Sequence, residues 1–214
     1  MTIATQSLYL TELQRVWADT PDSAHDLGHI HRVWRTCQTI ADAENADLEI
    51  LHPAAIFHDI INLPKSDPNR AQASRLCADH AAQYLLATDF PAHKIPAVYH
   101  AIHAHSLSAK IPCETQEAQI LQDADRLDAL GAIGIARCFA VSGQLNRALF
   151  HATDPMASNR PLDEATYALD HFQTKLFKIA QTLHTATAQA IAVERVKTMQ
   201  HFCETLAAEV CPKT

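Results

Sequence analysis

The sequence predicts an all-α protein, and two observations lead to that prediction. Only four of the 214 residues are glycine, while alanine recurs throughout; an all-β fold needs many glycines for turns with positive φ. Apolar residues also recur three and four positions apart, which is the spacing of one face of an α-helix. With 48% apolar and 19% charged residues, the chain is long enough to bury a substantial core.

The first three helices follow from this spacing. A helix is predicted over residues 3–19 and ends at Thr20-Pro21-Asp22-Ser23. The second starts at Leu27 and carries a regular apolar stripe, made of Leu27, Ile30, Val33, Trp34, Cys37, Ile40 and Ala41. The segment from Pro53 to Leu63 is nearly all apolar, so we expect a buried helix with proline in its first turn and His58-Asp59 in its middle.

The remaining chain predicts further helices and a single domain. Helices are expected near residues 70–88, 93–105 and 116–128, followed by an apolar segment with Gly131 and Gly134 and by two long final helices over 163–183 and 187–209. The chain contains no internal repeat and no low-complexity linker. We therefore predict one compact helical domain over residues 1–214, with a motif-bearing core at about 22–145.

Charge and cysteine usage narrow the range of partners. The formal charge is −7, with 17 basic against 24 acidic residues and no long basic run, which argues against nucleic acid as the main partner. The N-terminal segment mixes charged and apolar residues, so neither a signal peptide nor a membrane span is expected. Six scattered cysteines without a CxxC pair suggest reduced thiols in a cytoplasmic protein. We expect the protein to be a monomer or a homodimer.

Polar residues interrupt the apolar pattern at three places. His58-Asp59 lies in an apolar segment, where a buried acid costs several kcal/mol unless it is paired or coordinated. An isolated His–Asp pair would be explained by a hydrogen bond within the core. The segments His25-Asp26-Leu27-Gly28-His29 and Asp123-Ala124-Asp125-Arg126-Leu127-Asp128 add imidazoles and carboxylates at two more helix edges, and the three edges together could hold one cation.

These motifs resemble the HD-domain superfamily of metal-dependent phosphohydrolases. The resemblance rests on HDLGHIHRVW, FHDIINLPKSDPNRAQAS, AIHAHS and QDADRLDALGAIGIAR, which are similar to a bacterial single-domain branch whose relatives include nucleotide pyrophosphohydrolases. It implies a single HD-type helical domain and a metal held by His29, His58, Asp59 and Asp125. Two imidazoles and two carboxylates suit Mn²⁺, our first choice, or Fe²⁺, Co²⁺ or Ni²⁺, better than Mg²⁺. Such a metal lowers the pKa of a bound water and polarises the phosphate.

Positive and polar side chains near the HD motif are candidates for phosphate binding. Lys65 and Arg70 follow the motif in a polar loop, Asn62 lies one turn beyond His58, and Arg32 shares a flank with His29. A guanidinium can bind phosphate oxygens in bidentate fashion. The alternative is that Lys65 and Arg70 are solvated charges and that Arg32 pairs with Asp26 or Asp128.

The general acid or base has to come from another part of the chain. Some relatives read HDxxED, but this chain has Asn62 after the motif, and an amide cannot act as a base. We therefore expect Lys65, His103, His105 and Asp128 to be the catalytic group, with His100 as a weaker candidate and His25 as a partner of the metal site. The alternative for His100, His103 and His105 is an ordinary position on an amphipathic surface.

The predicted function is hydrolysis of a phosphate ester or anhydride of a nucleotide, or of a related small phosphorylated metabolite, by a metal-activated water. One alternative is a diiron oxygenase on the same scaffold, which needs extra ligands such as His80, His103 and His105. Another is a catalytically silent nucleotide-binding regulatory module. The retained ligand set argues against the silent module, because simple binding needs no activated water.

Overall fold

The computed structural model describes residues 3–18, 27–63, 67 and 69–210. The chain divides into two compact units, Met1–Asp125 and Arg126–Thr214. Every regular element among the described residues is a helix, so the predicted all-α class is confirmed. An isolated parallel bridge between Ala148 and Tyr167 adds one point of β pairing to the described part. One domain over residues 1–214 stays a prediction.

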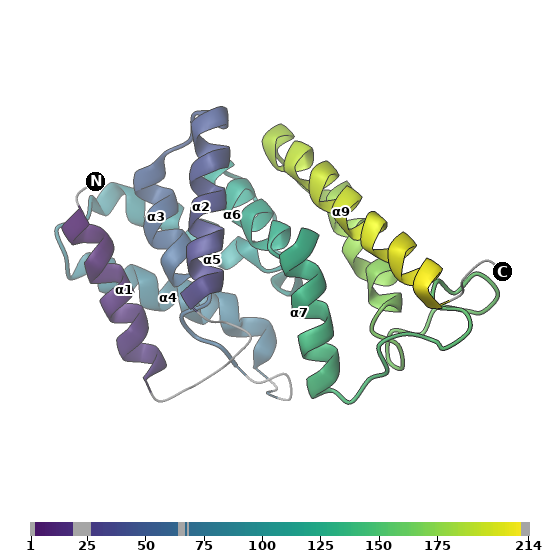
Figure 1. Cartoon of the computed structure of the whole chain (residues 1–214). Helices are drawn as coiled ribbons and strands as arrows, with labels where there is room; N and C mark the ends of the chain where they lie inside the picture. The colour runs from purple at the N-terminus through teal and green to yellow at the C-terminus, as the bar shows by residue number, and fades with distance from the viewer. Residues whose placement is uncertain (1–2, 19–26, 64–66, 68, 211–214) are drawn as a thin grey trace. The chain divides into compact units, whose positions relative to one another are not determined.

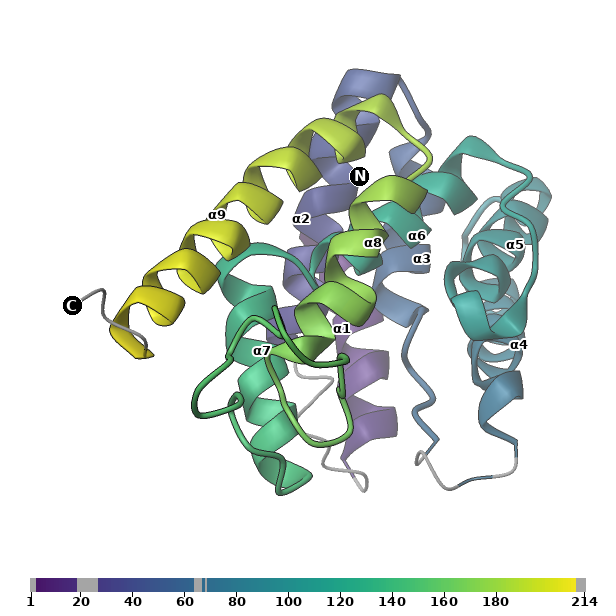
Figure 2. The ribbon, with the colours of Figure 1, turned by 90° about the vertical axis from the view of Figure 1, so that its right-hand side faces the viewer.

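In the first unit, α3 is the central helix, and α1, α2, α4 and α5 each pack against it (Figure 1). The helices α4 and α5 also lie side by side (Figure 2). The helices are α1 (Ile3–Trp17), α2 (Leu27–Glu44), α3 (Leu48–Phe57), α4 (Ala73–Leu86), α5 (Ile95–His105) and α6 (Gln116–Leu127), whose residues up to Asp125 belong to this unit. Short 3₁₀ turns occupy Arg70–Gln72, Ala92–Lys94 and Leu107–Ala109.

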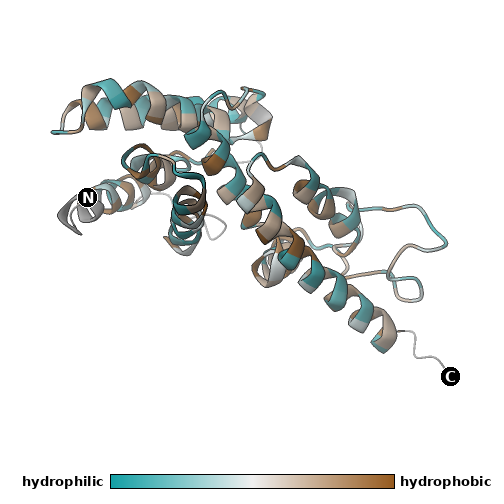
Figure 3. Cartoon of the chain, turned by 90° about the horizontal axis from the view of Figure 1, so that it is seen from above, coloured by the Kyte–Doolittle hydropathy of each residue, from teal (hydrophilic) through white to brown (hydrophobic). Residues whose placement is uncertain are grey.

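The predicted apolar stripe of α2 is its buried face, except for Leu27, which is half-buried. Hydrophobic and hydrophilic residues alternate along single helices in Figure 3, as expected for amphipathic helices. The buried residues of α2 are His29, Ile30, Val33, Trp34, Cys37, Ile40 and Ala41. Burying one large aliphatic side chain contributes about 1.5–3 kcal/mol. The stripe therefore fixes α2 against its neighbours and brings His29 into the interior with it.

The helix that precedes the HD motif begins and ends earlier than the sequence predicts. The Asp47 carboxylate accepts a hydrogen bond of 2.9 Å from the Glu49 N–H and caps the start of α3, so Pro53 lies inside the helix and not in its first turn. The helix ends at Phe57, with His58 as its C-cap. His58-Asp59 therefore lies at the end of a helix, and the prediction that it lies in the middle is wrong.

The second unit is built on α7 (Gly131–Gln144) and α9 (Ala186–Val210), which pack against each other. Between them the chain forms a π-helical turn at Phe172–Leu176, the short helix α8 (Phe177–Ile179) and a 3₁₀ turn at Ala180–Thr182. The rings of Phe139, Phe172 and Phe202 form a cluster with centroids 5.8–6.2 Å apart. Through these rings α7, α9 and the π-helical turn contact one another.

The long helix predicted over residues 163–183 is wrong in its first third. Helical structure begins only at residue 170, and the preceding residues form turns. The Asp163 carboxylate accepts hydrogen bonds from the N–H groups of Ala165 and Thr166, at 3.1 and 3.2 Å, which offers the backbone a turn in place of a helix. Asp170 strengthens this arrangement, because its carboxylate accepts the Asp163 N–H at 2.7 Å.

The hydropathy of the helices and the state of the cysteines complete the description of the fold. Among the described helices, none combines the length and the hydropathy that a membrane crossing requires. The described cysteines, Cys37, Cys77, Cys113, Cys138 and Cys203, are free thiols. The cytoplasmic location itself stays a prediction.

Candidate metal centre

Three histidines and two aspartates converge inside the first unit. His29 comes from α2, His58 and Asp59 from the end of α3, His105 from the last residue of α5, and Asp125 from α6. The three imidazoles are buried, with 1%, 0% and 6% of His29, His58 and His105 exposed. The carboxylates of Asp59 and Asp125 keep 23% and 30% of their side-chain surface. The cluster is therefore closed on the imidazole side and open on the carboxylate side.

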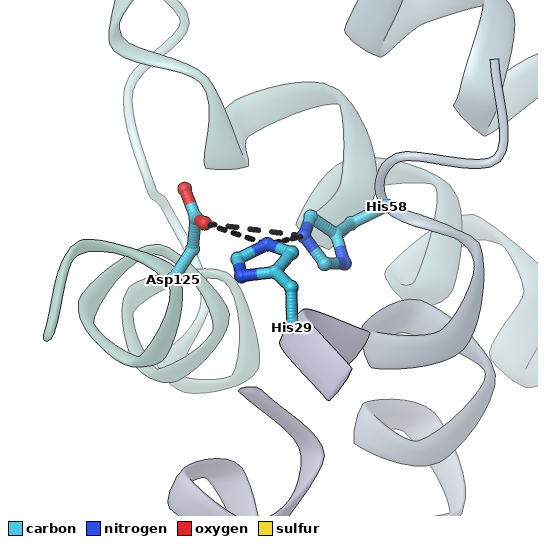
Figure 4. A group of neighbouring side chains, drawn as sticks. All are labelled: His29, His58 and Asp125. Atoms are coloured by element: carbon cyan, nitrogen blue, oxygen red, sulfur yellow. Dashed lines mark hydrogen bonds and ion pairs between the residues drawn. The ribbon is translucent and has the colours of Figure 1, made fainter. Parts of the chain in front are cut away.

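His29, His58 and Asp125 form the centre of this group (Figure 4). His29 Nε2 lies 3.3 Å from His58 Nε2 and 3.4 Å from Asp125 Oδ1. His58 Nε2 lies 4.0 Å from the same carboxylate oxygen. In Figure 4 the two ring nitrogens and the carboxylate oxygen point toward one another.

Asp59 turns its two oxygens to different sides of the cluster. Its Oδ2 atom lies 3.8 Å from His29 Nε2 and 3.6 Å from His58 Nε2. Its Oδ1 atom lies 3.5 Å from His105 Nε2. Asp59 is thus the side chain that connects the two predicted histidine ligands with His105.

The spacing of these atoms fits a single transition-metal ion. Donor atoms that bind one cation at about 2.1 Å lie roughly 3.0–4.2 Å from one another, depending on the coordination angle. His29 and His58 lie 3.3 Å from each other, and their distances to the oxygens of Asp59 and Asp125 range from 3.4 to 4.0 Å. Two nitrogen and two oxygen donors also match the preference of first-row divalent metals. His29, His58 and Asp125 can therefore hold such an ion together, and Asp59 as a fourth ligand stays a prediction.

Backbone hydrogen bonds orient two of the imidazoles. His58 Nδ1 donates to the Ala55 carbonyl at 2.8 Å, and His105 Nδ1 donates to the Ile102 carbonyl at 2.6 Å. A carbonyl can only accept, so each Nδ1 carries the proton when the ring is neutral. The Nε2 lone pairs of His58 and His105 consequently face the cluster, as metal binding or proton transfer there requires.

Burial and the neighbouring charges act on the titration of the cluster. Burial lowers the pKa of His58 to about 4, so its imidazole is neutral near pH 7. Burial alone would raise the pKa of Asp125, but the hydrogen bond with His29 and the charges of His58 and His29 outweigh it and lower that pKa. A neutral imidazole and an ionised carboxylate are the forms in which these groups bind a metal.

His105 differs from the other two histidines. Burial lowers its pKa, but the interaction with Asp59 outweighs burial, and the pKa of His105 lies above its ordinary value. A histidine whose charged form is favoured beside a carboxylate is suited to proton transfer.

Three of the four candidate substrate residues, Arg32, Asn62 and Arg70, lie within the described part of the chain. Arg70 is exposed, and its Nη1 donates to the Leu63 carbonyl at 2.6 Å. Arg32 and Asn62 are half-buried, and both take part in interactions with other residues. Lys65 and His25 lie outside the described residues. Phosphate binding by these side chains stays a prediction.

The other candidate catalytic residues have local partners. The ring of His103 packs edge-on against Tyr99, with centroids 5.8 Å apart, and His100 Nε2 accepts the Glu114 N–H at 3.0 Å. Asp128 is 3% exposed, and its carboxylate pairs with Arg137 at 2.6 Å. Catalytic roles for His103 and Asp128 stay predictions.

Two residues that sequence reasoning missed hold the backbone just after the HD motif. Trp17 Nε1 donates to the Ile60 carbonyl at 3.1 Å. Cys77 Sγ lies 3.3 Å from the Ile61 N–H nitrogen and 3.4 Å from the Ile61 carbonyl oxygen. In the sequence Trp17 and Cys77 look like ordinary apolar positions of helices, so neither gives a signal of this role.

Comparisons with known proteins agree with this site. The profile of the HD domain family matches residues 26–130, a range that contains all four predicted ligands. YpgQ of Bacillus subtilis is 30% identical to this chain in an alignment that covers 96% of each chain. A crystal structure of YpgQ in complex with ADP superposes with a TM-score of 0.75 at 30% identity, covering 98% of this chain and 96% of that one. An HD-superfamily hydrolase from Bacillus thuringiensis gives a TM-score of 0.76 at 28% identity, with 98% of both chains covered.

Proposed function

Because the chain belongs to the HD-domain family, we propose that it is a metal-dependent phosphohydrolase. The observation that carries the proposal is the cluster of His29, His58 and Asp125, whose ligand atoms all lie within 4.8 Å of one another, with Asp59 beside it. The similar hydrolase from Bacillus thuringiensis supports the class of reaction. The proposed substrate is a phosphate ester or anhydride of a nucleotide or a related small metabolite.

His29, His58, Asp59 and Asp125 would hold the metal, with Mn²⁺ as our first choice. When bound, such an ion supplies a water of lowered pKa and a positive charge for the phosphate oxygens. Burial keeps the imidazole of His58 neutral, and both His29 and His58 lie away from bulk water. The part-exposed carboxylates of Asp59 and Asp125 leave the other side of the site for substrate.

His105 is the residue to which we assign proton transfer. Its Nδ1 proton is held by the Ile102 carbonyl, so Nε2 is the atom that exchanges a proton in the site. The hydrogen bond between His105 and Asp59 orients this nitrogen and favours its protonated form. In that form Nε2 can donate a proton to the oxygen that leaves the phosphorus atom, which removes charge from the leaving group.

A nucleotide is the favoured substrate class. The support is the structure of YpgQ in complex with ADP, since YpgQ is similar over nearly the whole of this chain. Cleavage of a triphosphate anhydride with release of pyrophosphate is the specific reaction that we propose. Arg32, Asn62, Lys65 and Arg70 would hold the phosphates that do not react; Arg70 uses one donor on Leu63, and a guanidinium has five.

The diiron oxygenase is the weaker alternative. It requires further histidine ligands, for which His80, His103 and His105 are the candidates. His80 Nε2 instead pairs with Glu12 at 2.9 Å, and the ring of His103 packs against Tyr99. His105 does reach the cluster, but a second iron needs more than one additional ligand.

A substrate screen tests the proposal. Nucleoside triphosphates, diphosphates, cyclic nucleotides and small phosphomonoesters should be incubated with the protein and Mn²⁺, Co²⁺, Ni²⁺ or Mg²⁺, with separate detection of phosphate and pyrophosphate. We expect turnover with Mn²⁺ and release of pyrophosphate from triphosphates. Turnover with phosphate as the only product would correct the reaction to a monoesterase. No hydrolysis under any metal, with nucleotide still bound, would favour the silent binding module.

A further inference from the structure

Asp59 follows the end of α3, so the helix does not itself fix the backbone of this proposed metal ligand. The helix α3 ends at Phe57, and the segment of residues 59–63, here called the dyad turn, has no regular secondary structure. A hydrogen bond from the Ile60 N–H to the Phe57 carbonyl, at 3.2 Å, ties this turn to the end of α3. The direction of the Asp59 carboxylate therefore depends on what else fixes the turn.

Side chains from three separate elements bind the dyad turn. Trp17, the last residue of α1, donates its indole N–H to the Ile60 carbonyl at 3.1 Å. Cys77 in α4 meets both backbone groups of Ile61, with distances of 3.3 and 3.4 Å. Arg70, in the 3₁₀ turn before α4, donates to the Leu63 carbonyl at 2.6 Å.

We infer that Trp17, Cys77 and Arg70 are positioning residues that fix the dyad turn and so the direction of the Asp59 carboxylate. This inference rests on the proposed function, because it assigns Asp59 to the metal. The positioning role requires no contact of these residues with metal or substrate, and for Arg70 it is separate from the proposed contact with phosphate. They hold the turn in one conformation before the metal binds. The turn therefore loses less conformational entropy when Asp59 binds an ion.

The chemistry of Cys77 suits this role. The residue is 1% exposed, and burial raises the pKa of its thiol to about 12, so the sulfur stays protonated. A protonated thiol can donate to the Ile61 carbonyl while its sulfur accepts the Ile61 N–H. It thus replaces both backbone partners that Ile61 would have inside a helix.

Arg70 connects the dyad turn with the segment that follows His105. The segment Arg70–Gln72 packs against Leu107–Ala109, which begins two residues after His105. The exposed guanidinium thus holds the Leu63 carbonyl from a turn that also borders the segment after His105. Arg70 then has a task on the backbone beside its predicted task on phosphate.

The test measures Mn²⁺ affinity of the full chain by calorimetric titration, together with the melting temperature of the metal-free protein. The variants are Trp17→Phe, Cys77→Ala and Arg70→Ala, and the rescue variants are Cys77→Ser and Arg70→Lys. Tyr84→Phe is the matched control for loss of one bond to a backbone carbonyl, since Tyr84 Oη donates to Leu8 at 3.3 Å. Cys203→Ala is the control for a buried thiol in the second unit.

We expect each of the three variants to bind Mn²⁺ about threefold to tenfold more weakly, which corresponds to the loss of one modest hydrogen bond. The serine and lysine variants should regain most of the affinity, and both controls should bind as the wild type does. Affinities within twofold of wild type in all three variants, with or without lower melting temperatures, would overturn the inference. Asp59→Ala in the same titration separates the two claims: wild-type affinity in that variant would remove Asp59 from the metal site and the positioning role with it.

Discussion

At the scale of single residues, the backbone partner of each imidazole decides what the ring can do. The carbonyl groups of Ala55 and Ile102 hold the Nδ1 protons of His58 and His105, so both rings present Nε2 to the cluster. The two rings then differ in their surroundings. Burial keeps His58 neutral as a ligand, while Asp59 favours the charged form of His105. The same residue type therefore serves two roles within one site.

The role of His105 can be tested apart from metal binding. We expect His105→Gln to lower kcat by about a hundredfold or more, because an amide has no exchangeable proton of suitable pKa, and general acid catalysis typically contributes 10²–10⁴-fold. The Mn²⁺ affinity should stay near that of the wild type, since the four ligands remain. Steady-state kinetics and a metal titration of the same preparation check this. An unchanged kcat would show that another residue transfers the proton. Loss of Mn²⁺ binding would show that His105 is a metal ligand.

Lys65 provides a test of phosphate binding that is independent of the metal. A charged hydrogen bond contributes about 1.5–3 kcal/mol, so Lys65→Ala should lower kcat/KM on the true substrate roughly tenfold to hundredfold. The loss should be larger for a triphosphate than for a small phosphomonoester, which has fewer oxygens to hold. Metal content should not change. Equal kinetics for variant and wild type on both substrates would show that the Lys65 charge is merely solvated.

At the scale of elements, sequence patterns predict which segments are helical better than they predict where helices end. The stripe of α2 is the buried face as predicted, because apolar spacing and burial have the same cause. The predicted end of α3 is wrong because the apolar run continues through Ile60 and Ile61, beyond the last residue of the helix. Apolar side chains can be buried from a turn as well as from a helix, so composition alone does not mark the boundary.

The segment before the π-helical turn offers a stability test at this scale. The Asp170 carboxylate is 1% exposed and accepts two Arg160 donors, at 2.6 and 2.7 Å, as well as the Asp163 N–H. Removing one partner of a buried ion pair costs about 3–5 kcal/mol. We expect Asp170→Ala to lower the free energy of unfolding by about 3 kcal/mol. This value is at the low end of that range because 14% of the Arg160 side chain is exposed to solvent.

Urea denaturation of Asp170→Ala and of a surface control checks this value. Lys197→Ala removes an exposed ion pair with Glu194 and should cost no more than about 0.5 kcal/mol. A similar small cost for Asp170→Ala would show that the turn before residue 170 is held by other contacts.

At the scale of the whole molecule, periodicity predicts the fold class, polar interruptions of the apolar pattern predict three helix edges that could share a cation, and the resemblance selects the four ligands. His29, His58 and Asp125 are separated by 29 and 67 positions in the chain, and no local spacing brings such residues together. Their convergence results from the packing of α2 and α5 around α3, together with the position of α6. The contacts of Trp17 and Cys77 with the dyad turn depend on the same packing, which explains why inspection of the sequence missed both.

Buried histidine also makes the stability of the molecule depend on pH. Among the described residues, His52 Nδ1 is buried without a hydrogen-bond partner, and burial lowers the pKa of His52 from 6.5 to about 4. The unfolded state therefore takes up this proton first as the pH falls, so stability is full above about pH 6.5 and declines toward pH 4. We expect His52→Leu to reduce the decline of the unfolding free energy between pH 7.5 and pH 5. If the unfolding free energy of His52→Leu declines as much as that of the wild type, other titratable groups cause the pH dependence.

Metal binding by Asp59→Ala tests the central claim most directly. Calorimetric titration with Mn²⁺ should show one site in the wild type and in Asp42→Ala, a control that removes an exposed acid from α2. Asp59→Ala should lose that binding while circular dichroism shows most of the helix content retained, because the apolar residues around the end of α3 can still pack. Full Mn²⁺ occupancy and normal turnover in Asp59→Ala would contradict the account.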